Sequence, residues 1–366
     1  MLRGKGATAV GGRFDAGAAP NAAVSQTVTK LVQQSRSSGR LNLSNQSLRT
    51  LPNALFTRED LKGGEPWWEE TDLLRLTVAD NELDAIDERV VQFGALTAID
   101  AHNNCISVLP DLSALQSLTI LQLSGNKLSV LPESLFSLPL AELHVSNNCI
   151  VQLPSEFERL GSTLVIMDIS NNALAALPTS SFSQFSQLTK FSAKSNKLAG
   201  PLCIRVAAPS LTHLDVSHNK LTSLGDLTGC NKLQDLNVSQ NALNALFTGI
   251  VVKLPSLVVL DIRINRLTSL GPDNSVCTPL LKDLLVAGNL LTTIAGSGLV
   301  ESCLAGLETL DVRDNNLDAV PALCVDMTEL KRLLLEGNAI RVPRRAILEK
   351  GTNAVLQWMR DQRVPV

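Results

Sequence analysis

The chain has 366 residues, 45% of them hydrophobic and 3% aromatic, and a formal net charge of −3. This balance argues against nucleic acid as the main partner, because phosphate binding needs a basic stripe and the sequence shows none. No run approaches the roughly 18 apolar residues of a membrane span, and the N-terminus lacks the apolar stretch of a secretory signal. These features predict an intracellular protein that binds neither nucleic acid nor membranes.

Cysteine usage favours the same compartment. The seven cysteines are scattered along the chain without the close pairing of a disulfide-capped extracellular repeat protein. Reduced thiols are therefore expected, which predicts a cytoplasmic location and leaves ciliary and nuclear locations open. The cysteines are Cys105, Cys149, Cys203, Cys230, Cys277, Cys303 and Cys324.

The first segment, residues 1–22, predicts a disordered tail. It is rich in Gly and Ala, carries scattered Arg and Lys, and has no apolar period. A mitochondrial presequence is the alternative, although such segments usually lack acids such as Asp15.

Residues 23–39 predict a short amphipathic helix that caps the repeats after it. Ser25 is a candidate N-cap and Gly39 a candidate stop signal. A cap is expected because an uncovered first coil would expose its leucines to water. One helical face carries the apolar residues Val24, Val28, Leu31 and Val32.

Residues 40–340 follow one repeated pattern, LxxLxLxxNxL, which is clearest from Leu118 to Leu128. Leu121 and Leu123 stand two apart, so on a strand they point to the same face. The asparagine side chain both donates and accepts hydrogen bonds, so it can satisfy backbone groups of adjacent coils. It recurs as Asn81, Asn104, Asn126, Asn148, Asn172, Asn196, Asn219, Asn241, Asn265, Asn289, Asn315 and Asn338, and Gln46 takes its place in an earlier coil.

After Asn81 the spacing between these asparagines is 22 to 26 residues. A period of roughly 20 to 29 residues with this pattern is that of a leucine-rich repeat, with one parallel strand in each coil. The sequence therefore predicts an α/β solenoid, a leucine-rich repeat horseshoe of about 13 coils with a parallel concave sheet.

Residues 57–72 form an inserted loop between the first two coils, because Gln46 and Asn81 are 35 residues apart. Trp67 and Trp68 lie in this loop beside acidic residues. Such a pair predicts either a lid packed on the solenoid or an exposed anchor for a partner. The lid is favoured because tryptophan is usually largely buried.

Residues 341–366 predict a helical C-terminal cap. Without it the leucines of the last coil would face water. Apolar residues at helical spacing on both sides of Gly351 are Ile347, Leu348, Val355, Leu356, Trp358 and Met359.

The sequence indicates no catalytic, cofactor-binding or metal-binding residues. His102 and His144 fall two coils apart, about 10 Å at a strand spacing of about 4.8 Å, too far for one ion held at about 2 Å. The acids Asp311, Asp314 and Asp318 lack the residue order of a calcium loop. Phosphate-cradling loops and nucleophile elbows are also missing, so the chain is not expected to be an enzyme.

The variable positions of the strands line the concave face and are polar with a recurring aspartate. In the C-terminal half, charged residues from alternate coils surround an outward-pointing leucine, which predicts a partner-docking patch with an apolar centre and a charged rim. The alternative is a solvated face with weak salt bridges. These side chains point away from the core, so their replacement is expected to cost little stability. The candidate contacts are Asp215, Asp261, Arg263, Leu285, Asp311 and Arg313, with Trp67 and Trp68 as the next candidates.

Three stretches outside the repeat core carry a family resemblance: Arg36–Pro52 (RSSGRLNLSNQSLRTLP), Trp67–Leu73 (WWEETDL) and Lys350–Gln362. They resemble the leucine-rich repeat-containing protein 40 family, and the Leu-Pro ends of several coils are similar to Ras-group leucine-rich repeat scaffolds. The resemblance spans residues 24–362, although this chain has fewer coils and several lack the proline. It implies an intracellular protein and no defined chemistry.

Together these features predict a non-catalytic scaffold or adaptor, monomeric on its own, that binds a protein partner on its concave face. Two alternatives stay open: a structural subunit of a large intracellular assembly such as a ciliary axoneme, or a regulatory subunit in a small GTPase or phosphatase pathway. No residue in the sequence identifies the partner.

Overall fold

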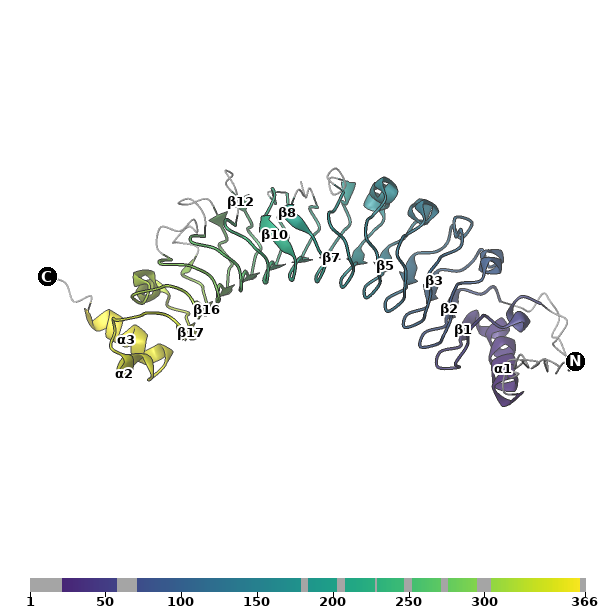
Figure 1. Cartoon of the computed structure of the whole chain (residues 1–366), viewed down its shortest axis with the longest axis horizontal. Helices are drawn as coiled ribbons and strands as arrows, with labels where there is room; N and C mark the ends of the chain where they lie inside the picture. Colours follow the sequence, from purple (N-terminus) through teal and green to yellow (C-terminus); the bar gives the residue numbers. More distant parts are fainter. Residues whose placement is uncertain are drawn as a thin grey trace, which may run out of the picture.

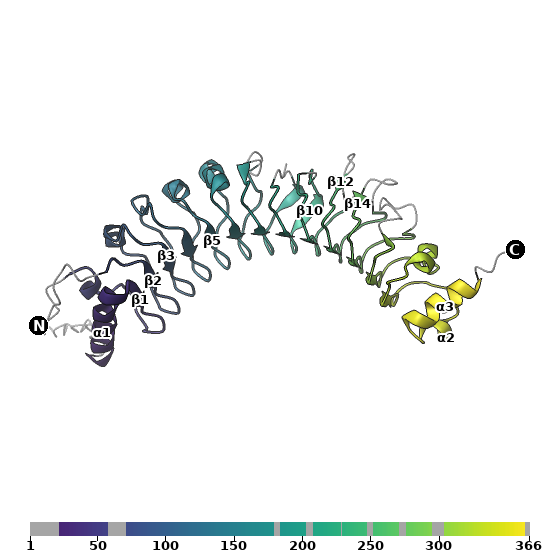
Figure 2. The same ribbon diagram turned by 180° about the vertical axis from the view of Figure 1, so that it is seen from behind.

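The computed structural model forms one long arc (Figure 1). A parallel sheet lines the inner side of the arc, while loops and short 3-10 helices form the outer side, and the rear view shows the same arrangement (Figure 2). The structure describes residues 22–57, 71–178, 184–202, 208–227, 229–246, 252–270, 276–294 and 304–362.

Within these residues, a 13-stranded sheet runs through the whole arc, and every neighbouring pair of strands is parallel. The predicted solenoid with a parallel concave sheet is confirmed. The strands are β1 (Arg40–Asn42), β2 (Arg75–Thr77), β3 (Ala98–Asp100), β4 (Ile120–Gln122), β5 (Glu142–His144), β6 (Ile166–Asp168), β7 (Lys190–Ser192), β9 (His213–Asp215), β11 (Asp235–Asn237), β13 (Val259–Asp261), β15 (Asp283–Leu285), β16 (Thr309–Asp311) and β17 (Arg332–Leu334).

The outer side carries shorter elements. Two further parallel pairs lie there, β8 (Ala199–Pro201) with β10 (Lys220–Ser223), and β12 (Val252–Lys253) with β14 (Val276–Cys277). The 3-10 helices are η1 (Asn53–Leu55), η3 (Glu88–Gln92), η4 (Glu133–Ser137), η5 (Ser155–Ser162) and η8 (Ala322–Asp326).

The core is a stack of equivalent leucines. The middle residue of each strand aligns with the middle residues of its neighbours, so Leu121 of β4 lies between Ile99 of β3 and Leu143 of β5. All three side chains are fully buried. Each coil thus buries its apolar residues against the coils on either side, which makes stability a property of the array.

The asparagine ladder joins the coils as predicted. Asn126 accepts a hydrogen bond from the Ile106 N–H of the preceding coil at 3.0 Å and donates to Ala101 O of that coil at 3.0 Å. It also donates to Leu123 O of its own coil at 2.9 Å. All the remaining ladder asparagines make equivalent bonds, so each amide satisfies backbone groups of two coils at once.

The residue before each ladder asparagine adopts positive φ, a feature that the sequence pattern did not reveal. Glycine, Asn and Asp tolerate this conformation and fill most of these positions, as at Gly125 (φ 70°) and Asn103 (φ 52°). Other residue types stand at Ser195, His218, Gln240 and Ile264, and Ile264 is strained because a β-branched residue rarely adopts φ 54°. The chain thus turns sharply out of the sheet in every coil.

At the N-terminal end, helix α1 (Ala22–Ser38) lies beside β1. Val28 and Val32 are buried in the common core. Gly39, at φ +66°, follows the helix, and its N–H donates to Ser35 O at 2.8 Å. The helix begins at Ala22, so the prediction that Ser25 is its N-cap was wrong.

At the other end, α2 (Arg345–Leu348) and α3 (Thr352–Gln362) lie beside the last strand, in yellow (Figure 2). The hydroxyl of Thr352 accepts a hydrogen bond from the Leu333 N–H of β17 at 3.0 Å, and this donor would otherwise sit on an open sheet edge. Among the described residues, no helix is long and apolar enough to cross a membrane.

Candidate functional site

The inner face of the sheet presents one side chain from the third residue of every strand. We call this line of side chains the central row. Because the strands are in register, residues far apart in the chain become neighbours, and Asp261, Leu285 and Asp311 follow one another across β13, β15 and β16. From β1 to β17 the central row is Asn42, Thr77, Asp100, Gln122, His144, Asp168, Ser192, Asp215, Asn237, Asp261, Leu285, Asp311 and Leu334.

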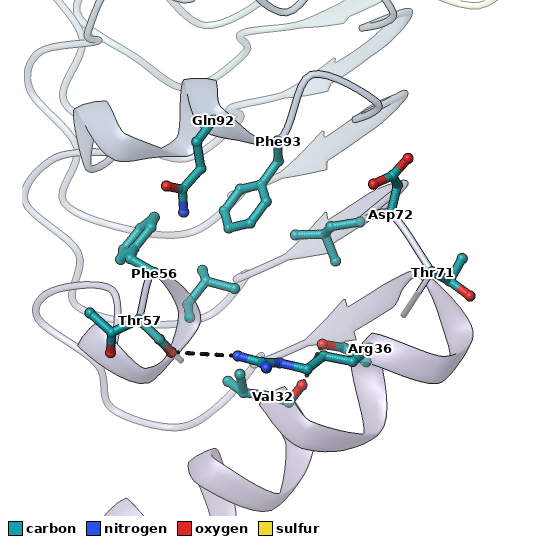
Figure 3. Close-up of a pocket in the computed structure, with 11 residues that line it drawn as sticks. Val32, Arg36, Phe56, Thr57, Thr71, Asp72, Gln92 and Phe93 are labelled. Carbon is teal, nitrogen blue, oxygen red and sulfur yellow. Dashed lines mark hydrogen bonds between the residues drawn. The ribbon is translucent and has the colours of Figure 1, made fainter. Parts of the chain in front are cut away.

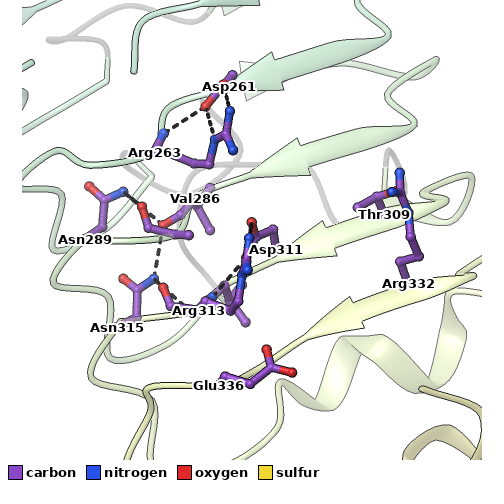
Figure 4. A network of polar contacts seen from close by, with 12 residues as sticks. Asp261, Arg263, Val286, Asn289, Thr309, Asp311, Arg313, Asn315, Arg332 and Glu336 are labelled. Atoms are coloured by element: carbon purple, nitrogen blue, oxygen red, sulfur yellow. Dashed lines mark hydrogen bonds and ion pairs between the residues drawn. The ribbon is translucent and has the colours of Figure 1, made fainter. Parts of the chain in front are cut away.

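The C-terminal patch, which consists of Asp261, Arg263, Leu285, Asp311 and Arg313, contains two tight ion pairs (Figure 4). Arg263 donates to the two carboxylate oxygens of Asp261 at 2.9 and 2.6 Å. Arg313 makes the same two bonds to Asp311, both at 2.8 Å. Each arginine therefore folds back on the aspartate two residues before it.

These pairs bury the aspartates. Only 6% of Asp261 and 1% of Asp311 is exposed, whereas the side chains of Arg263 and Arg313 remain 42% exposed. The expectation that Asp261 and Arg313 could be replaced at little cost to folding is therefore wrong, because removal of an arginine would leave a buried carboxylate unpaired.

Hydrogen bonds to the aspartates raise the pKa of Arg263 and of Arg313. Both arginines thus stay charged, but each charge is matched within its own strand. Leu285 lies half-buried between the two pairs. One half-buried leucine therefore lies between two neutralised ion pairs, and the docking role of these residues stays a prediction.

A second ionic cluster lies next to this patch. Glu308 accepts from the ammonium groups of Lys282 at 2.8 Å and of Lys331 at 2.7 Å. These hydrogen bonds and charges lower the pKa of Glu308 to about 2. The charge of Glu308 is therefore matched by two lysines inside the protein.

The middle of the concave face differs, because it contains a cavity of about 370 Å³. We call it the central hollow. Its carboxylates, Asp168, Asp215 and Asp235, come from three different coils, and its side chains come from strands β5 to β11. The lining residues are His144, Ile166, Met167, Asp168, Lys190, Phe191, Ser192, His213, Leu214, Asp215, Asp235 and Asn237.

No arginine in the part of the chain that the structure describes is paired with these acids. The position two residues after the aspartate is Ser170 in one coil and Ser217 in the other, where the C-terminal patch has arginine. Among the described residues, no ion pair joins Asp168, Asp215 or Asp235 to a lysine or arginine. The hollow therefore keeps a net negative character that the C-terminal patch lacks.

The raised pKa of Asp235 is consistent with the negative charge of the hollow. Burial raises the pKa of this carboxyl, the nearby charges of Asp215 and Asp261 raise it further, and His213 opposes the shift. Asp235 was not among the residues singled out from the sequence. The sequence did contain a signal for the hollow itself, because Ser192 is a small residue between Asp168 and Asp215 in the central row.

A larger cavity of about 510 Å³ lies at the N-terminal end, between α1, η1 and the end of η3 (Figure 3). Arg36 crosses it and donates to Thr57 O at 3.4 Å. Thr57 and Thr71 line it, and they adjoin the stretch 58–70, where the chain is not described. Trp67 and Trp68 lie outside the described residues, so their assignment as a lid or an anchor stays a prediction.

Two histidines on the inner face lie close to carboxylates, His102 beside Asp100 and Asp80 and His144 beside Glu142. His102 has Asp100 at 2.6 Å from its Nδ1 and Asp80 at 3.8 Å from its Nε2, so a carboxylate faces each ring nitrogen. No group of three or more His, Cys, Asp or Glu side chains within the described ranges is placed to hold a metal ion.

Comparison with known proteins agrees with this architecture. Family models described as leucine rich repeats match residues 117–138, 209–248 and 231–291. The fold is that of a leucine-rich repeat solenoid, and the matched residues carry the repeat that these models describe.

Solved structures of the same fold come from several bacteria. A leucine-rich repeat protein of Leptospira interrogans is 24% identical with a TM-score of 0.58, and the match covers 88% of this chain and 96% of that one. An internalin of Listeria monocytogenes is 20% identical (TM-score 0.56; 72% and 74% covered). YopM of Yersinia enterocolitica is 22% identical (TM-score 0.52; 86% and 72% covered). At these identities the likeness shows the fold alone.

Proposed function

We propose that this protein is a non-catalytic scaffold or adaptor that binds a protein partner on its concave face. The observation that carries the proposal is the inner sheet itself. Its outward side chains differ from coil to coil, whereas the core and ladder positions repeat. Partner recognition is expected at the positions whose side chains vary between coils, because the repeated core and ladder positions serve the fold.

The size of the face is sufficient. At about 4.8 Å per strand, the sheet spans about 60 Å along the arc, enough for a standard interface of about 800 Å² per partner. We propose two contact regions within it. Asp215 belongs to the central hollow, and Leu285 with the exposed faces of Arg263 and Arg313 forms an apolar contact with a paired ionic rim. Asp261 and Asp311 act by holding those arginines in place.

The resemblance of the non-repeat stretches to the leucine-rich repeat-containing protein 40 family, and of the Leu-Pro coils to Ras-group scaffolds, supports an intracellular adaptor. On this proposal the protein acts in cytoplasmic signal transduction and is monomeric on its own. A small GTPase or a phosphatase is one candidate class of partner, and a large structural assembly is the other.

Affinity purification from the native cell, followed by cross-linking and mass spectrometry, tests the proposal. A partner cross-linked to residues of β6 to β16 is the expected result. State-dependent capture would indicate a regulatory adaptor, while stoichiometric co-fractionation with a large particle would indicate a structural subunit. Cross-links confined to the outer side of the arc would overturn the assignment of the concave face.

A further inference from the structure

Resting on the proposed function, we infer that the central hollow receives an arginine or lysine side chain of the partner protein. The inference names the chemistry of one contact, namely a cationic head group with an aliphatic stem. It depends on the shape of the hollow and on the open acceptors of its carboxylates. It also depends on the finding that no described lysine or arginine forms an ion pair with them.

The shape follows from residue size. Ser192 lies between Asp168 and Asp215 in the central row, so a short side chain stands between two longer ones and leaves a depression. Ile166 is half-buried and lines the hollow, which provides an apolar wall beside the acids. Arginine and lysine match such a site because their methylene stems pack on apolar surface while the charged head reaches polar groups.

The carboxylates have acceptor capacity to spare. Asp215 accepts from the Ser217 N–H at 2.9 Å and from the Asn237 amide at the long distance of 3.5 Å. No described residue donates a hydrogen bond to the carboxylate of Asp235. A carboxylate has about four acceptor positions, so both groups can take further donors.

The Ser217 hydroxyl, which is not among the side chains that line the hollow, shows that the polar groups beside Asp215 are not all paired. It is buried, with 1% of the residue exposed, and has no hydrogen-bond partner among the described residues. The equivalent hydroxyls of Ser170 and Ser239 donate to Asp168 and Asn237 on their own strands. A buried hydroxyl without a partner is uncommon, and this one lies two residues after Asp215.

The charge of the hollow selects a cation. Asp235 faces Asp215 and His213 of β9 and Asp261 of β13, and Asp261 is already paired with Arg263. Lys190 lines the hollow but makes no ion pair with its acids among the described residues. A guanidinium placed between Asp215 and Asp235 would supply paired N–H donors to both.

The experiment compares two labelled peptides that differ in charge alone. One carries two arginines in a Gly-Ser sequence and the other carries citrulline at those positions, and fluorescence anisotropy measures their affinity for the full chain. The test variant is Asp215→Asn with Asp235→Asn. Its matched control is Glu88→Gln with Glu329→Gln, which removes the same charge from exposed positions outside the concave sheet.

We expect the wild type to prefer the arginine peptide, the test variant to lose about tenfold in affinity for it, and the control variant to stay within about twofold of wild type. Lys190→Ala should bind the arginine peptide at least as tightly as wild type, because it removes a competing cation. Equal affinity of the wild type for both peptides, or equal losses in the test and control variants, would overturn the inference.

Two other occupants give different results. Tight calcium binding that disappears in the test variant would make the hollow a metal site, and dimerisation lost in that variant would make it a self-association surface. Either result contradicts the inference. Cross-links of a partner to the concave strands would still uphold the proposed function, so the two failures can be told apart.

Discussion

The central hollow and the C-terminal patch use the same aspartate position of the repeat with opposite outcomes. Asp215 and Asp311 both lie in the central row on equivalent strands. Two residues later the chain has Ser217 in one case and Arg313 in the other. The arginine neutralises and buries its aspartate, while the serine leaves the carboxylate half-buried and able to accept further hydrogen bonds.

The comparison separates the charges that stabilise this solenoid from those available to a partner. An ion pair within one strand is made once the coil folds, so its arginine contributes little net attraction to another molecule. An unmatched carboxylate lowers the stability of the free protein, and a cation of the partner that pairs with it offsets this cost on binding. The centre of the face is therefore the better place for charge-dependent recognition.

The largest effect expected is for Arg313→Ala, which leaves the buried carboxylate of Asp311 without its partner. We expect a loss of about 2–3 kcal/mol, below the full cost of breaking a buried pair, because the Arg313 side chain is 42% exposed. Urea unfolding measures it. Lys194→Ala is the matched control, since this exposed lysine occupies the same repeat position as Arg313 and should lose under about 0.5 kcal/mol. Equal losses would remove the distinction between the two regions.

Asp235→Asn should have a smaller effect of opposite sign and stabilise the protein at neutral pH by under about 1 kcal/mol. The folded-state pKa of Asp235 is raised, so its ionisation opposes folding above that pKa. The advantage of the variant should fade as the pH falls through the raised pKa of Asp235 toward the ordinary value of 3.8, and should be nearly absent below it. Unfolding curves at several pH values measure this, and a destabilised variant at pH 7 would show that the carboxylate is satisfied in the free protein.

The smallest effect expected is at the exposed cluster around Glu308. Its pKa is lowered from 4.5 to about 2, so its stabilising contribution is complete above pH 4.5 and is lost as the pH falls through about 2. Glu308→Gln should therefore be slightly less stable than wild type at neutral pH, and the two should converge in acid. Thermal midpoints between pH 2 and 7 test this. A constant difference would mean that the two lysines do not hold Glu308 as the structure places them.

Much of the fold could be predicted from the sequence, because its determinants are local. Leu121, Leu123 and Asn126 lie within six residues and fix the strand face and the turn. The N-cap of α1 was mispredicted at Ser25, which lies inside the helix, because the apolar spacing marks a helical face without fixing the capping residue. Gln240 and Ile264 show why the positive-φ turn was missed, since their residue types do not favour it.

The candidate site was harder to predict for a physical reason. The burial of Asp261 depends on how the Arg263 side chain folds back, and a strand pattern says nothing about that. The hollow needs Asp168, Ser192 and Asp215, which stand 24 and 23 residues apart and meet only through the register of the sheet. A sequence can show which residues face outward, but not which charges remain unmatched.

Hydroxyl-radical footprinting of the protein with its purified partner tests most directly whether the central hollow makes the charge-selective contact. His213 of β9 lines the hollow, and His102 follows β3, five strands away in the same sheet. The account predicts that the partner lowers the oxidation of His213 and leaves His102 unchanged, and that Asp215→Asn with Asp235→Asn restores oxidation of His213. Protection of Leu285 with none at His213 would place the contact at the C-terminal patch and contradict the account.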